Sequence, residues 1–387
     1  MSKFEFTRYL YIKDEVILSF AISLIQKENL HECYFWLSEL YYSNYNMNDI
    51  ILKIYYDFYY TNNAQFEKYI YKKLKNNDNN DNNDNLSQYI TITKNLFNLS
   101  ISCDVFLNRQ ASLKNHNKDS NKHIFKGRKP KWLDNIKQEF HILFRYLNKD
   151  KLSEFYCELY KMDDNLLKDI FEQFKIYDTR FCFRMLNNEF YKYDLRHMLL
   201  AYVVKDKNIK DTKKNKNIYV LSSDYENEQL INTNIPLPPR DFVDSRNITH
   251  KMNEVGKTLM CKRHFKINKN IICFDFLRRN MEHKDVYNKY HYNWEYYAYN
   301  CEVWKERMTA YKVSFDTKKN DEWNYIRFPN DDLLEEFYEK FGYEPDEQSK
   351  ETNEKNLNDI HGHNYSINEW LKTTFDYSGG DYNILYY

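Results

Sequence analysis

The chain has 387 residues, with 57 basic and 57 acidic side chains, so its formal net charge is zero. Proteins that wrap nucleic acid usually carry a basic excess, so neutrality argues against that class without excluding a local patch. Only 6 glycines occur, which argues against nucleotide-binding α/β enzymes, because their phosphate-binding turns need glycine.

The first predicted elements are four amphipathic helices between Asp14 and Leu74. Apolar residues recur there at helical spacing, as in the first stripe of Val16, Ile17, Phe20, Ala21, Leu24 and Ile25. Short polar breaks separate the helices, which predicts antiparallel hairpins. The stripe repeats after about 34 residues, as in helix-pair repeats, but a solenoid needs roughly three units. An irregular helical domain therefore stays open as the alternative.

Two polar insertions interrupt the helical pattern, which otherwise continues to residue 204. Residues 76–85 contain only Asn and Asp and are predicted to be disordered, because such a tract buries nothing. Residues 108–131 are polar and basic and are predicted to form a second disordered insertion. We therefore expect residues 1–204 to form one mostly helical domain.

The character of the sequence changes after a Lys/Asn/Asp linker at residues 205–216. We expect a small α+β domain at 217–345 and a polar C-terminal tail at 346–387. The predicted fold class is thus mainly α, with an N-terminal antiparallel helical-hairpin (solenoid-like) domain followed by a small α+β domain.

Within the α+β domain, alternation predicts two β-hairpins, one at residues 258–277 and one that pairs Tyr311–Phe315 with Trp323–Phe328. A helix is predicted from Tyr292 to Met308. A last helix follows Pro329 and carries the clearest end signals, with a capping box and a C′ glycine. These end signals are Asp332, Glu335 and Gly342.

Several aromatic-rich strings resemble uncharacterised proteins of Mimivirus-like giant viruses. They are HYNWEYYAYNCEVWKERM (His291–Met308), IRFPNDDLLEEFYEKFGYEPDEQ (Ile326–Gln348), CYFWLSELYYSN (Cys33–Asn44) and KIYYDFYY (Lys53–Tyr60). The resemblance covers both ends of the chain. It implies that the protein is viral and that it is located in the host cytoplasm or in a viral factory. It implies no activity and no catalytic residues.

The localisation expected from the residues themselves is intracellular. No run of 18 apolar residues occurs, so no membrane-spanning helix is predicted. The first residues lack the apolar core of a signal peptide. The seven cysteines are scattered and odd in number, as expected for reduced thiols.

No catalytic residue, metal site or cofactor is predicted, and an enzyme is less favoured than a binding protein. Cys261, His264 and Cys273 offer three zinc ligands, whereas a structural zinc site usually has four in tight pairs. Glu335, Glu336 and Glu339 share a helix surface, but no apolar pocket pairs with them, so we interpret them as a solvated face. An enzyme whose site escapes motif search stays open as a third alternative.

The predicted function is a non-enzymatic protein–protein interaction scaffold. Four tyrosines fall toward helix ends or outside the apolar stripes, so we expect some of them to be exposed and to bind a protein partner. They are Tyr42, Tyr45, Tyr56 and Tyr60.

The alternative function is a nucleic-acid-associated viral factor that acts in transcription, replication or translation through a basic loop at 114–131. Its candidate phosphate ligands are Lys126, Arg128, Lys129 and Lys131. An aromatic neighbour, Phe125 or Trp132, would stack on a base. A solvated loop in a Lys-rich protein explains the same residues.

Overall fold

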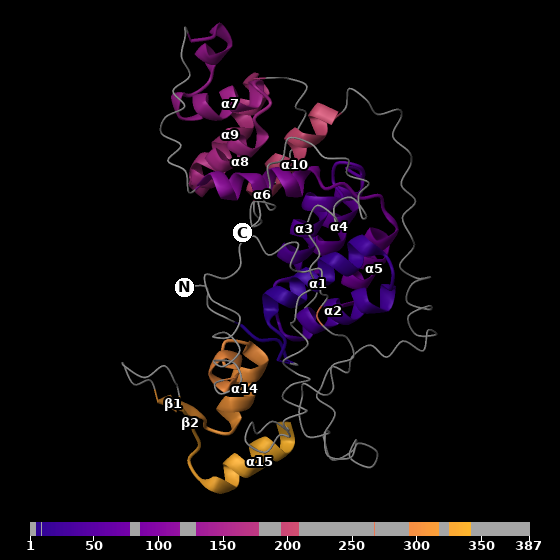
Figure 1. Cartoon of the computed structure of the whole chain (residues 1–387), viewed down its shortest axis with the longest axis vertical. Coiled ribbons are helices and arrows are strands. Elements are labelled where there is room, and N and C mark those ends of the chain that lie inside the picture. The colour runs from indigo at the N-terminus through magenta and orange to yellow at the C-terminus, as the bar shows by residue number, and fades with distance from the viewer. Residues whose placement is uncertain are drawn as a thin grey trace. The chain divides into compact units, whose positions relative to one another are not determined.

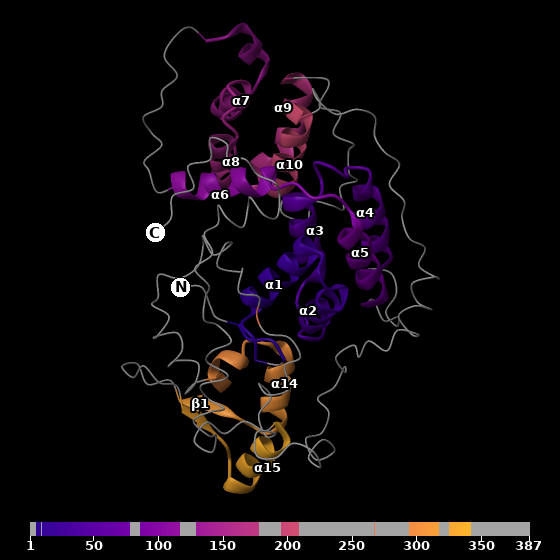
Figure 2. The same ribbon diagram turned by 45° about the vertical axis from the view of Figure 1, so that its right-hand side comes forward.

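The computed structural model describes residues 5–8, 10–77, 86–116, 129–177, 195–208, 267, 294–316 and 325–341. This part of the chain is mainly helical and contains one two-stranded sheet (Figures 1 and 2). The predicted mainly-α class is therefore confirmed. The chain divides into two compact units, which are described separately below.

Unit 1 comprises Met1–Met47, Asn82–Phe97 and Leu221–Trp370. Its described elements come from three distant parts of the sequence. They are α1 (Lys13–Gln26), α2 (Leu30–Tyr42), most of α5 (Leu86–Asn98), α14 (Glu302–Ala310), β1 (Ser314–Asp316), β2 (Tyr325–Arg327) and α15 (Asp331–Phe341).

The α1–α2 pair forms the first predicted helical hairpin. At the end of α1, Lys27 adopts a left-handed conformation with φ of 57°, and its N–H donates to the Ser23 carbonyl. Two residues later, the Asn29 side chain accepts a hydrogen bond from the His31 N–H and caps α2. The short connection lets α2 pack directly on α1. The buried stripe, with Val16 and Phe20 fully buried, faces the unit interior.

The described part of the predicted α+β domain does not have a core of its own. Phe6, Leu10 and Ile12, from the other end of the sequence, belong to the same hydrophobic cluster as its side chains. The remaining buried members are Trp294, Ala298, Cys301, Trp304, Met308, Tyr311, Phe337 and Phe341. The predicted boundary at residues 205–216 therefore separates segments that pack together. The polar composition of residues 205–216 indicated a linker. Composition gives no information about contacts between distant parts of the sequence, such as those between residues 6–12 and 294–341.

The local elements of this region follow the prediction in part. β1 and β2 pair antiparallel, with Phe315 opposite Ile326, which confirms the second hairpin. The predicted helix 292–308 is wrong as a single element: a helical turn at 294–298 ends before Cys301, whose extended backbone precedes α14. The cap of α15 is Asn330, whose Oδ1 accepts from the Leu333 N–H at 3.0 Å, rather than the predicted Asp332.

Unit 2 comprises Asn48–Asp81, Asn98–Val220 and Leu371–Tyr387. Its described elements are α3 (Met47–Phe58), α4 (Phe66–Asn77), α6 (Asp104–His116), η2 (Lys131–Asn135), η3 (Gln138–Phe140), α7 (His141–Asn148), α8 (Leu152–Lys161), α9 (Asp164–Tyr177) and α10 (Leu195–Asn208). Helix α8 packs against α6, α7 and α10. Residues 197–204 of α10 are all buried, as expected for a helix at the centre of a bundle.

The α3 and α4 helices confirm the second predicted pair of helices, and α4 continues two residues into the predicted 76–85 insertion. This pair belongs to unit 2 and the first pair to unit 1. Solenoid-like stacking of the two pairs therefore stays a prediction.

Helix α6 corrects the first part of the predicted insertion at 108–131, because residues 108–116 are helical. It begins with a side-chain cap, because the Asp104 N–H donates to Ser102 Oγ at 3.2 Å. Asn108 is buried and donates to the Asp104 carbonyl at 2.8 Å, and Ser112 donates to the Arg109 carbonyl at 2.6 Å. Polar composition suggested disorder, but these side chains are satisfied within the helix itself.

Other predictions fall outside the described residues. They concern most of the 76–85 insertion, the hairpin at 258–277 apart from the buried Ile267, the linker at 209–216 and the tail at 346–387. The first four linker residues are helical, because α10 extends to Asn208.

Candidate functional site

The four tyrosines proposed for partner binding lie in different environments. Tyr42 and Tyr45 are half-buried in unit 1, whereas Tyr56 and Tyr60 are buried in unit 2. The expectation of exposure is wrong for Tyr56 and Tyr60. The ring of each of these tyrosines packs against other aromatic rings, so the presence of a hydroxyl group did not indicate an exposed side chain.

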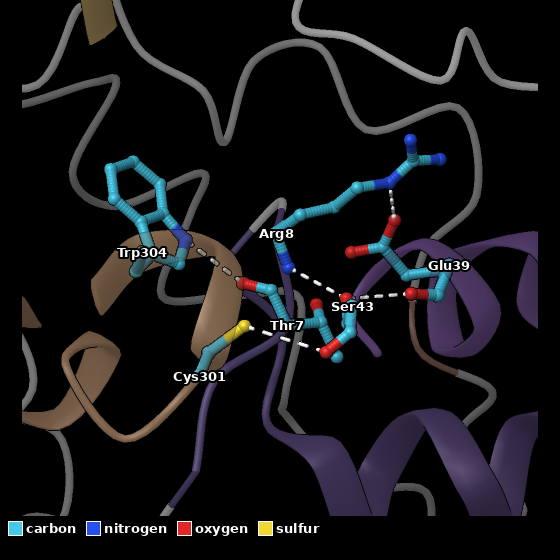
Figure 3. Close-up of polar contacts among 6 residues, drawn as sticks. All are labelled: Thr7, Arg8, Glu39, Ser43, Cys301 and Trp304. Carbon is cyan, nitrogen blue, oxygen red and sulfur yellow. Dashed lines mark hydrogen bonds and ion pairs between the residues drawn. The ribbon is translucent and has the colours of Figure 1, made fainter. Parts of the chain in front are cut away.

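Unit 1 contains a buried ion pair (Figure 3). The Arg8 Nε donates to Glu39 Oε2 at 2.9 Å, and the two side chains are only 2% and 0% exposed. The Arg8 guanidinium also lies over the Tyr42 ring, 4.6 Å from its centroid. A charge at this depth is tolerated only with an opposite charge and further partners. Tyr42 thus completes the environment of a buried cation.

The backbone of the same segment is held by the end of α2. The Arg8 N–H donates to Ser43 Oγ at 2.9 Å, and the Ser43 hydroxyl donates to the Glu39 carbonyl at 2.6 Å. The Tyr45 hydroxyl donates to the Phe6 carbonyl at 2.7 Å. Burial raises the pKa of Tyr45, so this phenol stays a donor over the whole neutral range. Tyr45 therefore holds the backbone of Phe6 in place within unit 1.

The first turn of α14 and the residue that precedes the helix complete this cluster from a distant part of the sequence. Figure 3 shows Trp304 and Cys301 approaching Thr7 and Ser43 from the α14 side. Trp304 Nε1 donates to the Thr7 carbonyl at 3.2 Å across 297 residues of sequence. The Cys301 thiol donates to the Ser43 carbonyl at 3.8 Å. No periodicity could have predicted these contacts.

Unit 2 contains a second buried polar cluster, around the Glu67 carboxylate. Glu67 Oε1 accepts from the Tyr56 hydroxyl at 2.8 Å and from the Tyr202 hydroxyl at 2.6 Å. The Tyr71 and Tyr56 hydroxyls are 2.8 Å apart. Glu67 is buried, and its phenol partners replace the water that the carboxylate would otherwise bind. Burial raises the pKa of Tyr56 and of Tyr202.

Both clusters join helices through hydrogen bonds between buried groups of the chain itself. The described cysteines are equally unsuited to nucleophilic chemistry, because burial raises the pKa of Cys33 and of Cys103 to about 12. Within the described ranges, no group of three His, Cys, Asp or Glu side chains is arranged to hold a metal ion. Glu335 and Glu336 are exposed on α15. The zinc-ligand candidates Cys261, His264 and Cys273 lie outside those ranges.

The structure describes two of the four residues of the predicted basic cluster. Lys129 and Lys131 are exposed, and Lys129 Nζ lies 3.0 Å from Asp134 Oδ1. Lys126 and Arg128 lie outside the described residues. Both ends of the predicted loop at 114–131 are helical, because α6 covers residues 114–116 and Lys131 starts the η2 helix.

Exposed apolar side chains occur at one end of the α7–α8 hairpin, and the sequence analysis missed them. Ile142 in the first turn of α7 is 50% exposed, and Tyr160 in the last turn of α8 is 53% exposed. A three-residue connection at 149–151 makes the packed helices antiparallel, so both residues lie at the end away from that connection. The sequence offered one sign of the exposure of Ile142, because this apolar residue lies outside the apolar stripe of its helix.

No helix in the described part of the chain is long and apolar enough to cross a membrane. No protein-family model, no curated protein and no solved structure matches the chain. The resemblance to giant-virus proteins therefore stays a prediction.

Proposed function

We propose that the chain is a non-enzymatic scaffold that binds a protein partner through one end of the α7–α8 hairpin. This end carries Ile142 and Tyr160, lies away from the 149–151 connection and is here called the hairpin tip. The single observation behind this proposal is the exposure of these two large side chains among the described residues. Apolar groups exposed within polar surroundings often mark protein interaction sites, and tyrosine is common at their energetic centres.

The surroundings of the hairpin tip support a partner with a mixed apolar and polar surface. Next to Tyr160 in the sequence, Lys161 pairs with Glu158 at 2.7 Å, and both of these charged side chains are partly exposed. A rim of charges around a small apolar centre is the usual anatomy of a protein–protein interface. The polar clusters at Glu39 and Glu67 support a scaffold too, because they join helices.

The test is affinity capture of the tagged protein from its native cells, with and without nuclease. The double variant Ile142→Ser/Tyr160→Ser is compared with Asn148→Ser/Lys149→Ser, which alters exposed residues at the other end of the same hairpin. We expect a nuclease-resistant partner whose affinity for the tip variant falls at least about 30-fold, as for two hot-spot side chains. Equal capture by both variants would reject the hairpin tip as the binding site.

The alternative function, nucleic-acid binding, is favoured by a different observation. Lys129 and Lys131 are exposed directly beside the half-buried Trp132. Cations next to an aromatic ring suit a single strand, whose phosphates and bases bind such groups. The resemblance to giant-virus proteins adds a host-cytoplasm or viral-factory setting to either proposal.

Salt dependence separates the two functions. We expect Lys126→Glu/Arg128→Glu/Lys129→Glu/Lys131→Glu to reduce affinity for single-stranded RNA or DNA and to lower the slope of log K against log salt by roughly 0.7 for each phosphate that is no longer neutralised. Lys149→Glu/Lys151→Glu, at exposed lysines elsewhere in unit 2, is the control. An equal decrease in both variants would indicate only a general charge effect.

A further inference from the structure

Residues 5–12 form a short, tightly bent segment at the start of unit 1; Tyr9 within it lies outside the described residues. Phe6 and Ile12 pair as an antiparallel bridge, and the Thr7 N–H donates to the Tyr11 carbonyl at 2.8 Å. Leu10 turns the chain with φ of 60°. A leucine seldom adopts this conformation, so the surrounding contacts must hold it there.

Three apolar side chains of this segment point into a core whose other buried members lie at 294–341. Phe6, Leu10 and Ile12 are 3%, 1% and 5% exposed. The other buried residues of that core come from the helical turn at 294–298, α14, α15 and the residues that adjoin them. We call residues 294–316 and 325–341 the carboxyl-terminal module. Without residues 5–12, its core would lose three large side chains and gain exposed apolar surface.

The polar atoms of the same segment connect the module to α2. On one side, Arg8 bonds to Glu39 and Ser43 of the α2 end. On the other side, the Thr7 carbonyl accepts from Trp304 of α14. One dipeptide thus contacts both partners, as Figure 3 shows. The α2 end also bonds to the module directly, because the Cys301 thiol donates to the Ser43 carbonyl and the Asn44 side chain donates to the Glu302 carboxylate.

We infer that residues 5–12 act as a strap, and that the carboxyl-terminal module keeps its packed core and its attachment to α2 only while the strap is in place. Cleavage or displacement of the strap would release the module and expose Trp294 and Trp304, which are now fully buried. The strap is a conformational control point that does not depend on the hairpin tip, which belongs to unit 2.

The test is hydrogen exchange of the full chain, measured by mass spectrometry at peptide level. Phe6→Ala removes a strap side chain that is 3% exposed, and Phe58→Ala removes an equally buried phenylalanine from unit 2. We expect Phe6→Ala to speed exchange at 294–310 and 331–341 by at least about tenfold and to leave 141–177 unchanged. Phe58→Ala should leave the module peptides unchanged.

The strap is rejected if Phe6→Ala leaves exchange in the module unchanged, or if it speeds exchange equally in both units. If Phe6→Ala yields no folded protein, Ile12→Val is the milder variant, because it removes a single methylene group. It should give the same regional pattern with a smaller increase. An even increase across both units in Ile12→Val would also reject the inference.

Discussion

The Tyr202 hydroxyl donates to Glu67 Oε1 at 2.6 Å, although the two residues are 135 positions apart. Tyr202 lies on α10, the buried helix of unit 2, and Glu67 lies in the first turn of α4. The Tyr60 and Tyr202 rings are also in contact, with centroids 4.9 Å apart. The bond therefore ties the interior of unit 2 to its first helices at a buried site.

Tyr202→Phe should destabilise the chain by about 1–3 kcal/mol, because it leaves a buried carboxylate with one fewer donor and adds no cavity. Thermal or denaturant unfolding measures the difference. Tyr160→Phe removes the hydroxyl of an exposed tyrosine and should change stability by less than about 0.5 kcal/mol. Equal effects of the two variants would mean that the Glu67 bond contributes nothing specific.

Arg8→Ala should cost about 3–5 kcal/mol, because it leaves the Glu39 carboxylate buried without its cation. Arg8→Met/Glu39→Met removes both charges and keeps the volume, so it should recover most of that stability. Lys151→Ala, which breaks an exposed pair with Glu154, is the control and should cost no more than about 0.5 kcal/mol. Denaturant midpoints compare the three variants. A double variant as unstable as Arg8→Ala would show that the ion pair itself is required.

Stability should fall at alkaline pH. Burial raises the pKa of Tyr45, Tyr55, Tyr56 and Tyr202 in the folded state. In the unfolded chain these phenols ionise near pH 10, so above that pH the unfolded state binds fewer protons than the folded state. Their contribution is thus complete below about pH 10 and declines as the pH rises further. Unfolding free energies from pH 8 upward, with tyrosinate absorbance, would measure this decline; a flat profile would contradict it.

The described cysteines should be slow to react. Burial raises the pKa of Cys33 and of Cys103 to about 12, so little thiolate is present at neutral pH and reagent access is blocked. Peptide-level mass spectrometry after brief alkylation should show both modified in denaturant and neither modified in buffer. Rapid labelling of Cys33 in buffer would indicate that the α1–α2 hairpin opens readily.

Elements with a clear apolar stripe could be predicted from the sequence. The stripes of α1 to α4 hold buried residues such as Phe20 and Ile51, and α15 buries the expected Phe337. In these helices a single periodicity decides which face is inside. In α6, by contrast, Asn108 and Ser112 are polar residues that are buried through bonds to their own helix, so no apolar stripe marked them as buried. Composition alone therefore assigned them to a disordered insertion.

The polar clusters could not be predicted, because each depends on a long-range partner. The sequence placed Tyr56 among the residues expected at the surface. In the structure its hydroxyl donates to Glu67 and its ring contacts Tyr202 at a buried site. Arg8 lies in a segment without periodicity, and only the position of Glu39 explains its burial. The exposed pair at the hairpin tip was missed for the opposite reason, since the stripes identify buried faces and ignore residues outside them.

The strap has a consequence for synthesis. Phe6 and Leu10 leave the ribosome almost 300 residues before Trp304, which packs in the same core. At 5–20 residues per second, the delay is roughly 15–60 seconds. Until then, Phe6, Leu10 and Ile12 lack the other side chains of their core, and closing so long a loop slows the formation of this contact. The nascent unit 1 is therefore most open to chaperones, or to aggregation, while the carboxyl-terminal module is still being made.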